Sequence, residues 1–563
     1  MGSGQHGVGA IAERGAVAVS TEGRWIGPAQ RPLLTWVSTT AAARASGVLI
    51  LPPVGYQWWS THRSLRVLAE RLADAGHVAM RLDYDGTGDS AGDQWEPDRV
   101  AAWRESVAAA VAELRAMGCV RVQLVGVRLG ATLALLDGAR LDVDGVAAWA
   151  PVTSGRRWSR ELKMLGDAVP EDGDRCGAGT IASAGIVFSA QTMADLGALA
   201  VAKLDATPAP RVLLVDAAVD EPAAGHLRAL GCDVDARALP GGDLALEQPT
   251  EDATVPEAIL DAVCGWLADP GDAPPLDPPA GSASASISWD GTPIREEVVR
   301  LGPERFVGIL STPAAQGAAG PTLVFLNTGS EPHVGPGRAW VEFARGLAAR
   351  GHRCLRVDWR GWGESPDAGR APGRPYDPPG EDDTLAIVAG LRREGHEQIV
   401  LVGLCASAWM ALRAVLRDPT VGVIALNPQL YWHQGDPVIA LLDVSIRWRR
   451  AVADRERRLA RWHLWTALDV LGHRPWGGRW LDDLRRGGAR AGLVFVRDDP
   501  GILFLRTRLR RRLDRTLRDG AVALVELDHI DHSMHRAWAR PVLLDAIAAE
   551  ARRLTGPARR AGS

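Results

Sequence analysis

A cysteine at a strand-to-helix turn is the residue of this sequence best placed for nucleophilic chemistry. The apolar run 399–402 leads into residues 403–407 (GLCAS), and a helical pattern follows. The pattern G-x-C-x-S puts small residues two positions before and after Cys405, as a strained turn that exposes a nucleophile requires. A thiolate at such a turn can attack acyl groups and form a thioester. The alternative is an ordinary buried strand that enters a helix, with Cys405 as a small core residue.

The elements that would position this cysteine occur twice along the chain. In the first half, strand patterns alternate with helical patterns at 47–51, 64–75, 77–82, 100–117 and 120–125. The second half repeats this order at 322–326, 340–349, 352–357 and 399–402. Such alternation predicts a mostly parallel sheet with crossover helices in each half. The pattern D-x-x-G-x-G-[DE]-S, at 83–90 and 358–365, indicates duplicated domains.

The chain length and one biased segment indicate where the domains divide. A chain of 563 residues exceeds one compact domain. Residues 269–286 are rich in Pro, Gly, Ala and Ser, which is typical of a semi-rigid linker. We therefore divide the chain into an N-terminal extension 1–29, a first domain 30–268, the linker 269–286, a second domain 287–555 and, within it, a cap at about 432–490.

Composition excludes several classes of function. The net charge is −4, so the chain as a whole gives no case for nucleic-acid binding. The six cysteines show neither C-x-x-C nor zinc-ligand spacing, so we expect no disulfide framework, no metal and no cofactor. The first twenty residues lack a signal-peptide pattern, and no run reaches the roughly 20 apolar residues that span a bilayer. We expect a soluble, cytoplasmic protein.

Several short motifs carry a family resemblance in both halves. They lie at 52–55, 83–92, 126–131, 150–152, 327–329, 335–338, 403–405, 427–429 and 531–533. With these motifs the chain resembles the α/β-hydrolase superfamily twice over, and more narrowly the hydrolases found with exosortase systems and their tandem bacterial relatives. The resemblance implies two tandem α/β-hydrolase domains, each a mostly parallel sheet flanked by helices. It says little about the substrate, because the fold hosts many reactions.

The resemblance implies a catalytic triad in the second half. In α/β-hydrolases the nucleophile, the acid and the histidine follow one another in that chain order. After Cys405, the strand 492–496 runs into a turn with two aspartates. The resemblance places Asp499 before the Pro-Gly turn, so it is the expected acid, with Asp498 as the alternative.

The third member of the implied triad is His532. It stands in an Asp-His-Ser setting before the last helix, which best matches the histidine of the family; His529 and His535 remain alternatives. His532 would take the thiol proton of Cys405, or hold a thiolate–imidazolium pair, and later protonate the leaving group. Asp499 would fix the histidine tautomer and stabilise its charged form.

The implied acyl intermediate also needs an oxyanion hole. By resemblance, the donors are the backbone N–H of Ala406, which follows the nucleophile, and an N–H near Thr328 or Gly329. A cysteine forms a thioester, which amines or other thiols can intercept. Cysteine therefore favours acyl transfer, thioester chemistry or lactone opening over lipid ester hydrolysis.

The first half lacks the residues for this chemistry. Arg128 stands where the nucleophile would be, and a guanidinium cannot be deprotonated in a protein. The late segment 239–246 carries no histidine, and His226 falls in a helix. We expect a catalytically silent domain, in which Arg128 pairs with a carboxylate such as Asp83 or Asp85. The alternative is that Arg128 binds an anionic ligand where an active site used to be.

The segment between residues 447 and 519 is basic and aromatic, with 20 arginines against 9 acidic residues. In this fold an insertion after the strand that ends at 427–429 usually forms a cap over the active site. A basic, aromatic cap would suit an acidic acyl carrier protein or the phosphates of a CoA substrate. The alternative is a solvated helical face with tryptophans in the core.

The leading hypothesis is an acyltransferase or thioesterase. It would act on an ester or thioester through a covalent acyl-thioester intermediate, in specialised metabolism or, by analogy alone, in cell-surface polymer assembly. The alternative is a non-catalytic scaffold in which both halves are relic hydrolases and the basic cap binds an acyl carrier protein or another acidic partner. The reactivity of Cys405 separates them, because an activated thiolate is alkylated fast and a buried structural thiol is not.

Overall fold

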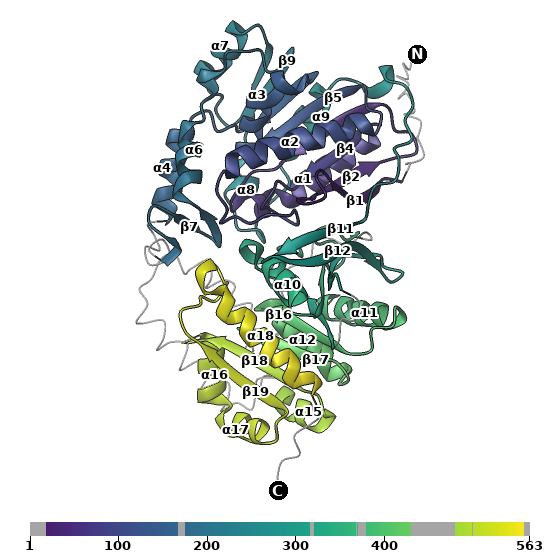
Figure 1. Cartoon of the computed structure of the whole chain (residues 1–563), viewed down its shortest axis with the longest axis vertical. Helices are drawn as coiled ribbons and strands as arrows, with labels where there is room; N and C mark the ends of the chain where they lie inside the picture. The colour runs from purple at the N-terminus through teal and green to yellow at the C-terminus, as the bar shows by residue number, and fades with distance from the viewer. Residues whose placement is uncertain are drawn as a thin grey trace, which may run out of the picture.

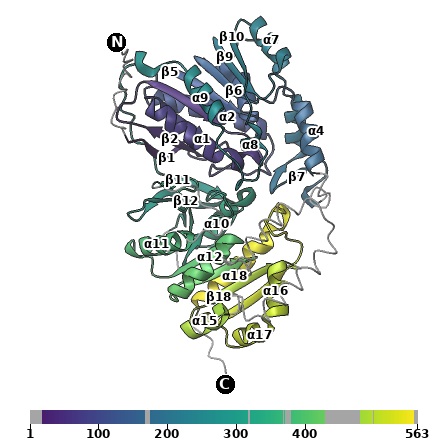
Figure 2. The same cartoon turned by 180° about the vertical axis from the view of Figure 1, so that it is seen from behind.

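The computed structural model describes residues 18–166, 175–315, 320–367, 369, 379–428, 479–497 and 499–556. These residues form one large sheet in each half of the chain and a separate two-stranded sheet. Helices cover both large sheets, and the two halves follow each other along the long axis of the molecule, with the first half above the second (Figure 1, and from behind in Figure 2). The prediction of two α/β domains with mostly parallel sheets is confirmed.

The described part of the first half contains an eight-stranded sheet in the order β1-β2-β4-β3-β5-β6-β9-β10. Strands β1, β2 and β4 pair antiparallel, and every other neighbouring pair is parallel. The strands are β1 (Ser20–Ile26), β2 (Leu33–Thr39), β3 (Ser46–Leu51), β4 (Val78–Leu82), β5 (Arg121–Val127), β6 (Gly145–Trp149), β9 (Arg211–Asp216) and β10 (Asp233–Ala238).

The helices of the first half enclose its sheet on both faces. They are α1 (Gln57–Asp74), α2 (Arg99–Ala116), α3 (Leu129–Leu141), α4 (Gly155–Gly166), α6 (Ala190–Ala198), α7 (Glu221–Ala229), α8 (Asp243–Leu246) and α9 (Glu257–Trp266), with short 3-10 turns η1 (Val201–Lys203) and η2 (Pro270–Asp272). Along β3, Val48 and Ile50 pack in the cluster that contains α1 and α9. Leu49 and Leu51 pack in the cluster that contains α2 and α3. Burial of both faces explains why β3 reads as a continuous apolar run.

The described part of the second half contains a nine-stranded sheet in the order β11-β12-β13-β15-β14-β16-β17-β18-β19. Strands β11, β12, β13 and β15 pair antiparallel, and the remaining pairs are parallel. The strands are β11 (Ser284–Trp289), β12 (Thr292–Leu301), β13 (Phe306–Pro313), β14 (Thr322–Phe325), β15 (Arg353–Val357), β16 (Ile399–Leu404), β17 (Gly422–Leu426), β18 (Ala491–Val496) and β19 (Val522–Leu527).

The helices of the second half repeat the two-sided arrangement. They are η3 (Pro336–Arg338), α10 (Ala339–Ala349), α11 (Pro379–Arg393), α12 (Ala406–Arg417), α15 (Arg479–Gly487), α16 (Pro500–Arg508), α17 (Arg510–Arg518), η5 (Ala537–Ala539) and α18 (Arg540–Thr555). In β16, Leu401 belongs to the cluster that contains α11 and α12. Val400 and Val402 belong to the cluster that contains α10 and α18. The alternation fixes which way the turn after β16 faces, because a strand places successive side chains on opposite faces.

Buried polar contacts join the two halves. His333 Nδ1 lies 2.6 Å from Asp358 Oδ2, and its Nε2 lies 2.8 Å from Asp89 Oδ2 in the other half. Burial alone would lower the pKa of His333, but the two carboxylates outweigh it and hold that pKa well above the ordinary value. His333 is therefore an imidazolium that both halves share.

A hairpin of the first half also contacts the second half. The two-stranded sheet, β7 (Ile181–Ser183) and β8 (Ile186–Phe188), turns at Gly185, whose carbonyl accepts a hydrogen bond of 3.1 Å from Arg540 Nη2. Arg175 stacks over the ring of Trp538 at 4.3 Å. Since residues 529–540 follow β19, the first half supports the loop that comes before the last helix.

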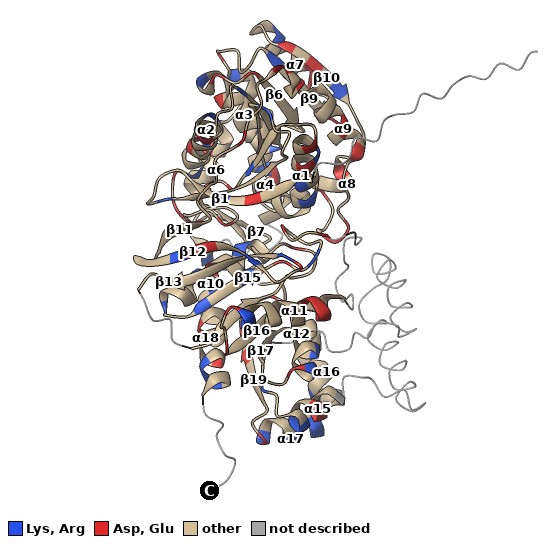
Figure 3. Cartoon of the chain, turned by 90° about the vertical axis from the view of Figure 1, so that its right-hand side faces the viewer, with Lys and Arg blue, Asp and Glu red and all other residues tan. Residues whose placement is uncertain are grey.

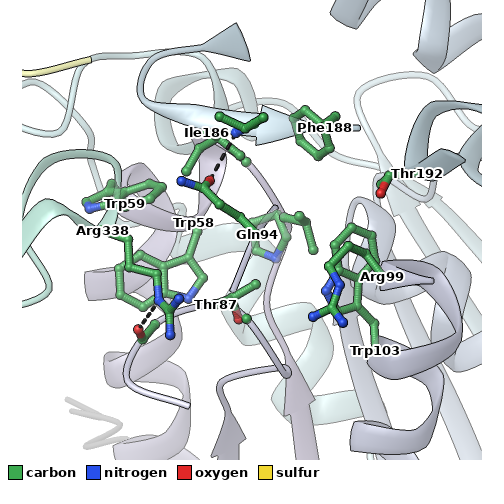
Figure 4. A pocket seen from close by; sticks show the side chains of 16 residues that line it. Trp58, Trp59, Thr87, Gln94, Arg99, Trp103, Ile186, Phe188, Thr192 and Arg338 are labelled. Atoms are coloured by element: carbon green, nitrogen blue, oxygen red, sulfur yellow. Dashed lines mark hydrogen bonds between the residues drawn. The ribbon is translucent and has the colours of Figure 1, made fainter. Parts of the chain in front are cut away.

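A small cavity lies where the halves meet, and Figure 4 shows its lining. Trp58 and Trp59 of α1 approach Arg338 of the second half, whose Nε donates a hydrogen bond of 2.8 Å to the carbonyl of Gly88. The cavity has a volume of about 30 Å³, which holds no more than a few water molecules. It is a seam between the halves and too small for a substrate.

Two predicted boundaries need correction. Strand β1 lies inside residues 1–29, which the sequence assigns to an extension; it belongs to the first sheet because Trp25 and Ile26 are buried and pair with β2. Strand β11 begins at Ser284, inside the predicted linker 269–286. Most of the predicted cap, about 432–490, lies outside the described residues, and only its last part, with α15, is described.

Candidate active site

Cys405 lies at the turn between β16 and α12, where the sequence predicts it. Its backbone has φ 56° and ψ −107°, and its N–H donates a hydrogen bond of 3.0 Å to the carbonyl of Leu426. A residue with a side chain seldom adopts a positive φ, so the strands and helix around it must hold this conformation. The turn therefore has the strained geometry of a nucleophile elbow.

The residues on either side of Cys405 explain the motif. A Cβ at Gly403 would lie 2.5 Å from the backbone nitrogen of Ala408, so no larger residue fits there without a shift of the helix. Ser407 is fully buried; its Oγ accepts a hydrogen bond of 3.0 Å from the N–H of Leu404. Ser407 thus bonds across the turn, which gives a physical reason for a serine where the usual motif has a second glycine.

The structure brings His532 and Asp499 together. His532 Nδ1 lies 2.6 Å from Asp499 Oδ2, although the two residues come from the loops after β19 and β18. Asp499 is 3% exposed and caps the N-terminus of α16, where its other oxygen accepts a hydrogen bond of 2.7 Å from the N–H of Gly501. The carboxylate is held from two sides, so it fixes the position of the imidazole.

The charge state of His532 reflects both of its partners. Burial lowers the pKa of His532, but hydrogen bonds with Asp499 and with the Cys405 side chain outweigh it and raise that pKa to about 10. The imidazole is therefore protonated at neutral pH. The site therefore holds a proton donor beside the cysteine.

Asn427 is a site residue to which the sequence analysis assigns no role. It follows β17 with a φ of 43°, and its Nδ2 donates a hydrogen bond of 3.0 Å to the carbonyl of His532. Its Oδ1 accepts a hydrogen bond of 2.9 Å from the N–H of Val496, at the end of β18. One amide thus joins the loops that carry the histidine and the acid. Its place in the 427–429 motif is the sequence signal that could have identified it.

The loop expected to supply an oxyanion donor follows β14. The N–H of Glu331 donates a hydrogen bond of 2.9 Å to the carbonyl of Thr328, which closes a turn, and Gly329 has a φ of 56°. The Thr328 hydroxyl is buried, with no hydrogen-bond partner among the described residues. Ala406, the other expected donor, is buried at the first position of α12.

The alternative residues occupy other environments. Asp498 lies outside the described residues. His535 Nδ1 lies 4.0 Å from Asp531 Oδ2, and the ring of His529 lies 6.3 Å from that of Trp538. His532 is the histidine for which the described contacts include Asp499.

The first half contains the same turn with arginine in place of cysteine. The prediction that Arg128 pairs with Asp83 or Asp85 is wrong. Asp85 is bonded instead to Arg31 and Arg99, and Asp83 accepts a hydrogen bond of 3.0 Å from the N–H of Asp89. Both aspartates are thus bonded to residues of their own half.

The described parts of the chain contain no cluster of three or more His, Cys, Asp and Glu side chains fit to hold a metal ion. Within the same parts, no helix combines the length and the apolar character that a membrane crossing needs. Figure 3 shows basic residues gathered on α15 and α17, at the end of the second half. Several of them pair with acids, such as Arg485 with Asp519 at 3.1 Å, as the solvated-face alternative expects.

Residues 323–554 match the model of the Alpha/beta hydrolase family. This match covers the second half, including the elbow and the loops after β18 and β19. None of the curated proteins matches the chain.

Similar solved structures align with about half of the chain. They include brefeldin A esterase, a bacterial homologue of human hormone-sensitive lipase (20% identity, 47% of this chain, 80% of that chain, TM-score 0.31). Others are dienelactone hydrolase from Anabaena variabilis (14% identity, 47% and 99%, TM-score 0.31) and Est1E from Butyrivibrio proteoclasticus with ferulic acid bound (16% identity, 43% and 96%, TM-score 0.33). Identities this low carry no substrate over to this chain.

Proposed function

We propose that the second half cleaves or transfers an acyl group from an ester or thioester, with Cys405 as nucleophile. The observation that carries this proposal is the chain of contacts Asp499–His532–Cys405 at a strained strand-to-helix turn. The match of residues 323–554 to a hydrolase family supports the general class. The nucleophile, the histidine and the acid have the residue types and the order that covalent acyl chemistry needs.

The proposed reaction has two stages. The Cys405 thiolate attacks the acyl carbon, the tetrahedral oxyanion collapses, and the leaving alcohol or thiol takes the proton of the His532 imidazolium. In the second stage neutral His532 removes a proton from water, or from an acceptor thiol or amine, which attacks the thioester and releases Cys405. Asp499 stabilises the imidazolium in both stages and keeps its Nδ1 proton in place.

The oxyanion would lie between the two loops that the sequence nominates. Ala406 offers a backbone N–H at the start of α12, where the helix dipole also favours negative charge. The turn that contains Thr328 and Gly329 offers the second donor. We propose that the first half is catalytically silent, because Arg128 occupies its elbow.

Intact-protein mass spectrometry tests this function. The full chain is incubated with a panel of acyl-CoA and acyl-pantetheine thioesters, beside the variants Cys405→Ala and His532→Ala. We expect an acyl adduct on the wild-type chain, none on Cys405→Ala, and slower formation on His532→Ala. Cys264→Ala is the matched control, because Cys264 is a half-buried free cysteine of the first half and should not change the adduct.

The second candidate is a non-catalytic scaffold that binds an acyl carrier protein or another acidic partner. The basic face of α17, on which Arg511, Arg515 and Arg518 are exposed, favours it. A scaffold would form no adduct with any thioester, and its Cys405 would react slowly with a thiol reagent at neutral pH. Fast alkylation of Cys405 without an acyl adduct would instead support the enzyme hypothesis, with a substrate outside the panel.

A further inference from the structure

The elbow of the first half keeps its strain although it has lost the nucleophile. Arg128 has φ 53° and ψ −118°, and its N–H donates a hydrogen bond of 2.9 Å to the carbonyl of Trp149. A Cβ at Gly126 would lie 2.4 Å from the backbone of Ala131, as tight as at the equivalent glycine of the second half. A strained conformation persists only where the surrounding structure maintains it. The first half therefore still presents a side chain at the point where α3 begins.

The acid position is kept as well. Asp220 follows β9 and caps α7, with its Oδ1 accepting a hydrogen bond of 3.1 Å from the N–H of Ala223. This is the place that Asp499 takes between β18 and α16. Among the described residues of the first half, no histidine is bonded to this carboxylate; instead Thr153 donates a hydrogen bond of 2.6 Å to Asp220 Oδ2.

A cavity of about 300 Å³ opens between these two positions. Arg128 and Asp220 both line it, so the cavity occupies the relic of an active site. The remaining wall is mixed: Thr153, Arg157 and Asp216 are polar, and Pro151, Leu214 and Val219 add apolar surface. Small-molecule sites combine apolar surface with polar groups that fix orientation.

The guanidinium of Arg128 has no ionic partner within the described residues. Its Nε donates a hydrogen bond of 3.3 Å to Gln57 Oε1, and its Nη1 donates one of 3.4 Å to the carbonyl of Ala150. Both contacts are long, and both acceptors are neutral. Burial lowers the pKa of Arg128, because the loss of hydration outweighs the charges of Glu161, Asp216 and Glu247, none of which forms an ion pair with it. A buried cation in this state is stabilised by any anion that enters the cavity.

We propose that this cavity is a second ligand site, which binds a monocarboxylate with an apolar chain. The guanidinium of Arg128 would bind the carboxylate through two parallel hydrogen bonds, a geometry that suits arginine. The apolar side chains would contact the chain. A phosphate dianion fits less well, because Asp216 and Asp220 line the same cavity and repel the second charge. Arg157 also lines the cavity, but it is paired with Glu161 at 3.5 Å. The site does not depend on the chemistry of the second half.

Isothermal titration calorimetry with hexanoate tests the proposal on the full chain. The protein carries Cys405→Ala, so that covalent chemistry in the second half plays no part. We expect hexanoate to bind, and Arg128→Gln in the same background to weaken that binding by about tenfold or more. Hexanamide, with the same shape and no charge, should bind less tightly than hexanoate.

A second variant and a folding control complete the test. Val219→Trp fills the cavity and leaves Arg128 in place, so it should also remove hexanoate binding even where Arg128→Gln impairs folding. Circular dichroism checks that each variant is folded. Three results overturn the proposal: no binding of hexanoate, binding that both variants leave unchanged, or inorganic phosphate binding more tightly than hexanoate.

Discussion

Arg81 of the first half and Glu364 of the second form a buried ion pair, with Nη1 and Oε1 2.8 Å apart. The repeated motif also forms the reverse pair, because Arg356 of the second half bonds to Asp89 of the first. Arg81 and Arg356 stand two residues before the first aspartate of each motif, and Asp89 and Glu364 are equivalent acids. The two copies of the repeated motif thus contact each other where the halves meet. Their reciprocal pairing is like that of the two partners in a two-fold dimer.

The buried pair should matter strongly to stability. Arg81→Ala leaves the Glu364 carboxylate buried and without its arginine, so we expect a loss of about 3–5 kcal/mol in the free energy of unfolding. Urea unfolding of the full chain measures it. Arg71→Ala, which removes exposed pairs with Glu257 and Asp261, is the control and should cost under about 1 kcal/mol. Equal losses in the two variants would contradict a structural role for the buried pair.

Cys405 should react with iodoacetamide faster than Cys264 at pH 7. Its side chain is hydrogen-bonded to His532, whose pKa is raised to about 10, so a positive charge lies beside the cysteine at this pH and makes it more reactive. Burial raises the pKa of the Cys264 thiol, which lowers its reactivity. Peptide mass spectrometry after timed quenching gives both rates. Equal rates would contradict an activated Cys405.

Replacing Asp499 should weaken the contact between His532 and Cys405. In Asp499→Asn the carboxylate that raises the pKa of His532 and holds its ring is lost. We expect alkylation of Cys405 at pH 7 to slow by about tenfold, because the imidazole loses the partner that fixes its position beside the thiol. Asp531→Asn, which changes an acid on the same loop, should leave the rate within about twofold of wild type. The assignment of Asp499 fails if the two variants react alike.

Glu331 should make stability depend on pH. Burial raises the pKa of its carboxyl to about 8, against an ordinary 4.5, and its Oε2 is buried with no hydrogen-bond partner in the described structure. Between these values the folded state holds a proton that the unfolded state has lost, so stability falls as pH rises from 4.5 to 8. Glu331→Gln should match wild type near pH 4.5 and exceed it by about 1–4 kcal/mol at pH 8. Thermal unfolding measures this gap, and Glu297→Gln, at an exposed acid, should show none.

Two glycine-to-alanine substitutions should change the free energy of unfolding in opposite directions. At Gly403 a Cβ would meet backbone atoms of the helix after the elbow at 2.5 Å, so Gly403→Ala should cost about 2 kcal/mol or more and disturb Cys405. In α9, Gly265 has nothing within 4 Å of an added Cβ, so Gly265→Ala should stabilise the chain by about 0.5–1 kcal/mol. Chemical denaturation compares them. If Gly403→Ala left the free energy of unfolding unchanged, the turn would have to widen enough to admit a side chain.

The local patterns of this sequence predict the central sheets well, because their causes are local. The run 399–402 is apolar on both faces, and small residues must surround Cys405, so strand and elbow can be recognised without a structure. The edge strands are harder to predict from the sequence. In β1 the first residues are exposed and only Arg24, Trp25 and Ile26 are buried, so the pattern alone resembles an extension.

Long-range contacts account for what the sequence could not predict. The two carboxylates that hold His333 come from residues 89 and 358, and no spacing rule connects them to it. Arg128 was expected to pair with an acid of the repeated motif, but Asp85 is bonded to Arg31 and Arg99, which come from other segments of the first half. Asn427 joins two loops that are more than 60 residues away along the chain.

The reciprocal pairing of the repeated motif has a consequence for how the two halves can vary. In a dimer of identical chains, a substitution at the elbow would appear in both partners at once. Here the two partners belong to one chain, so the first can carry arginine at residue 128 while the second keeps cysteine at residue 405. The shared motif must stay complementary in both, since Asp89 and Glu364 each depend on an arginine of the opposite half. Because the two halves are covalently joined, only the residues that hold them together must stay complementary, whereas the residues at the two elbows are free to differ.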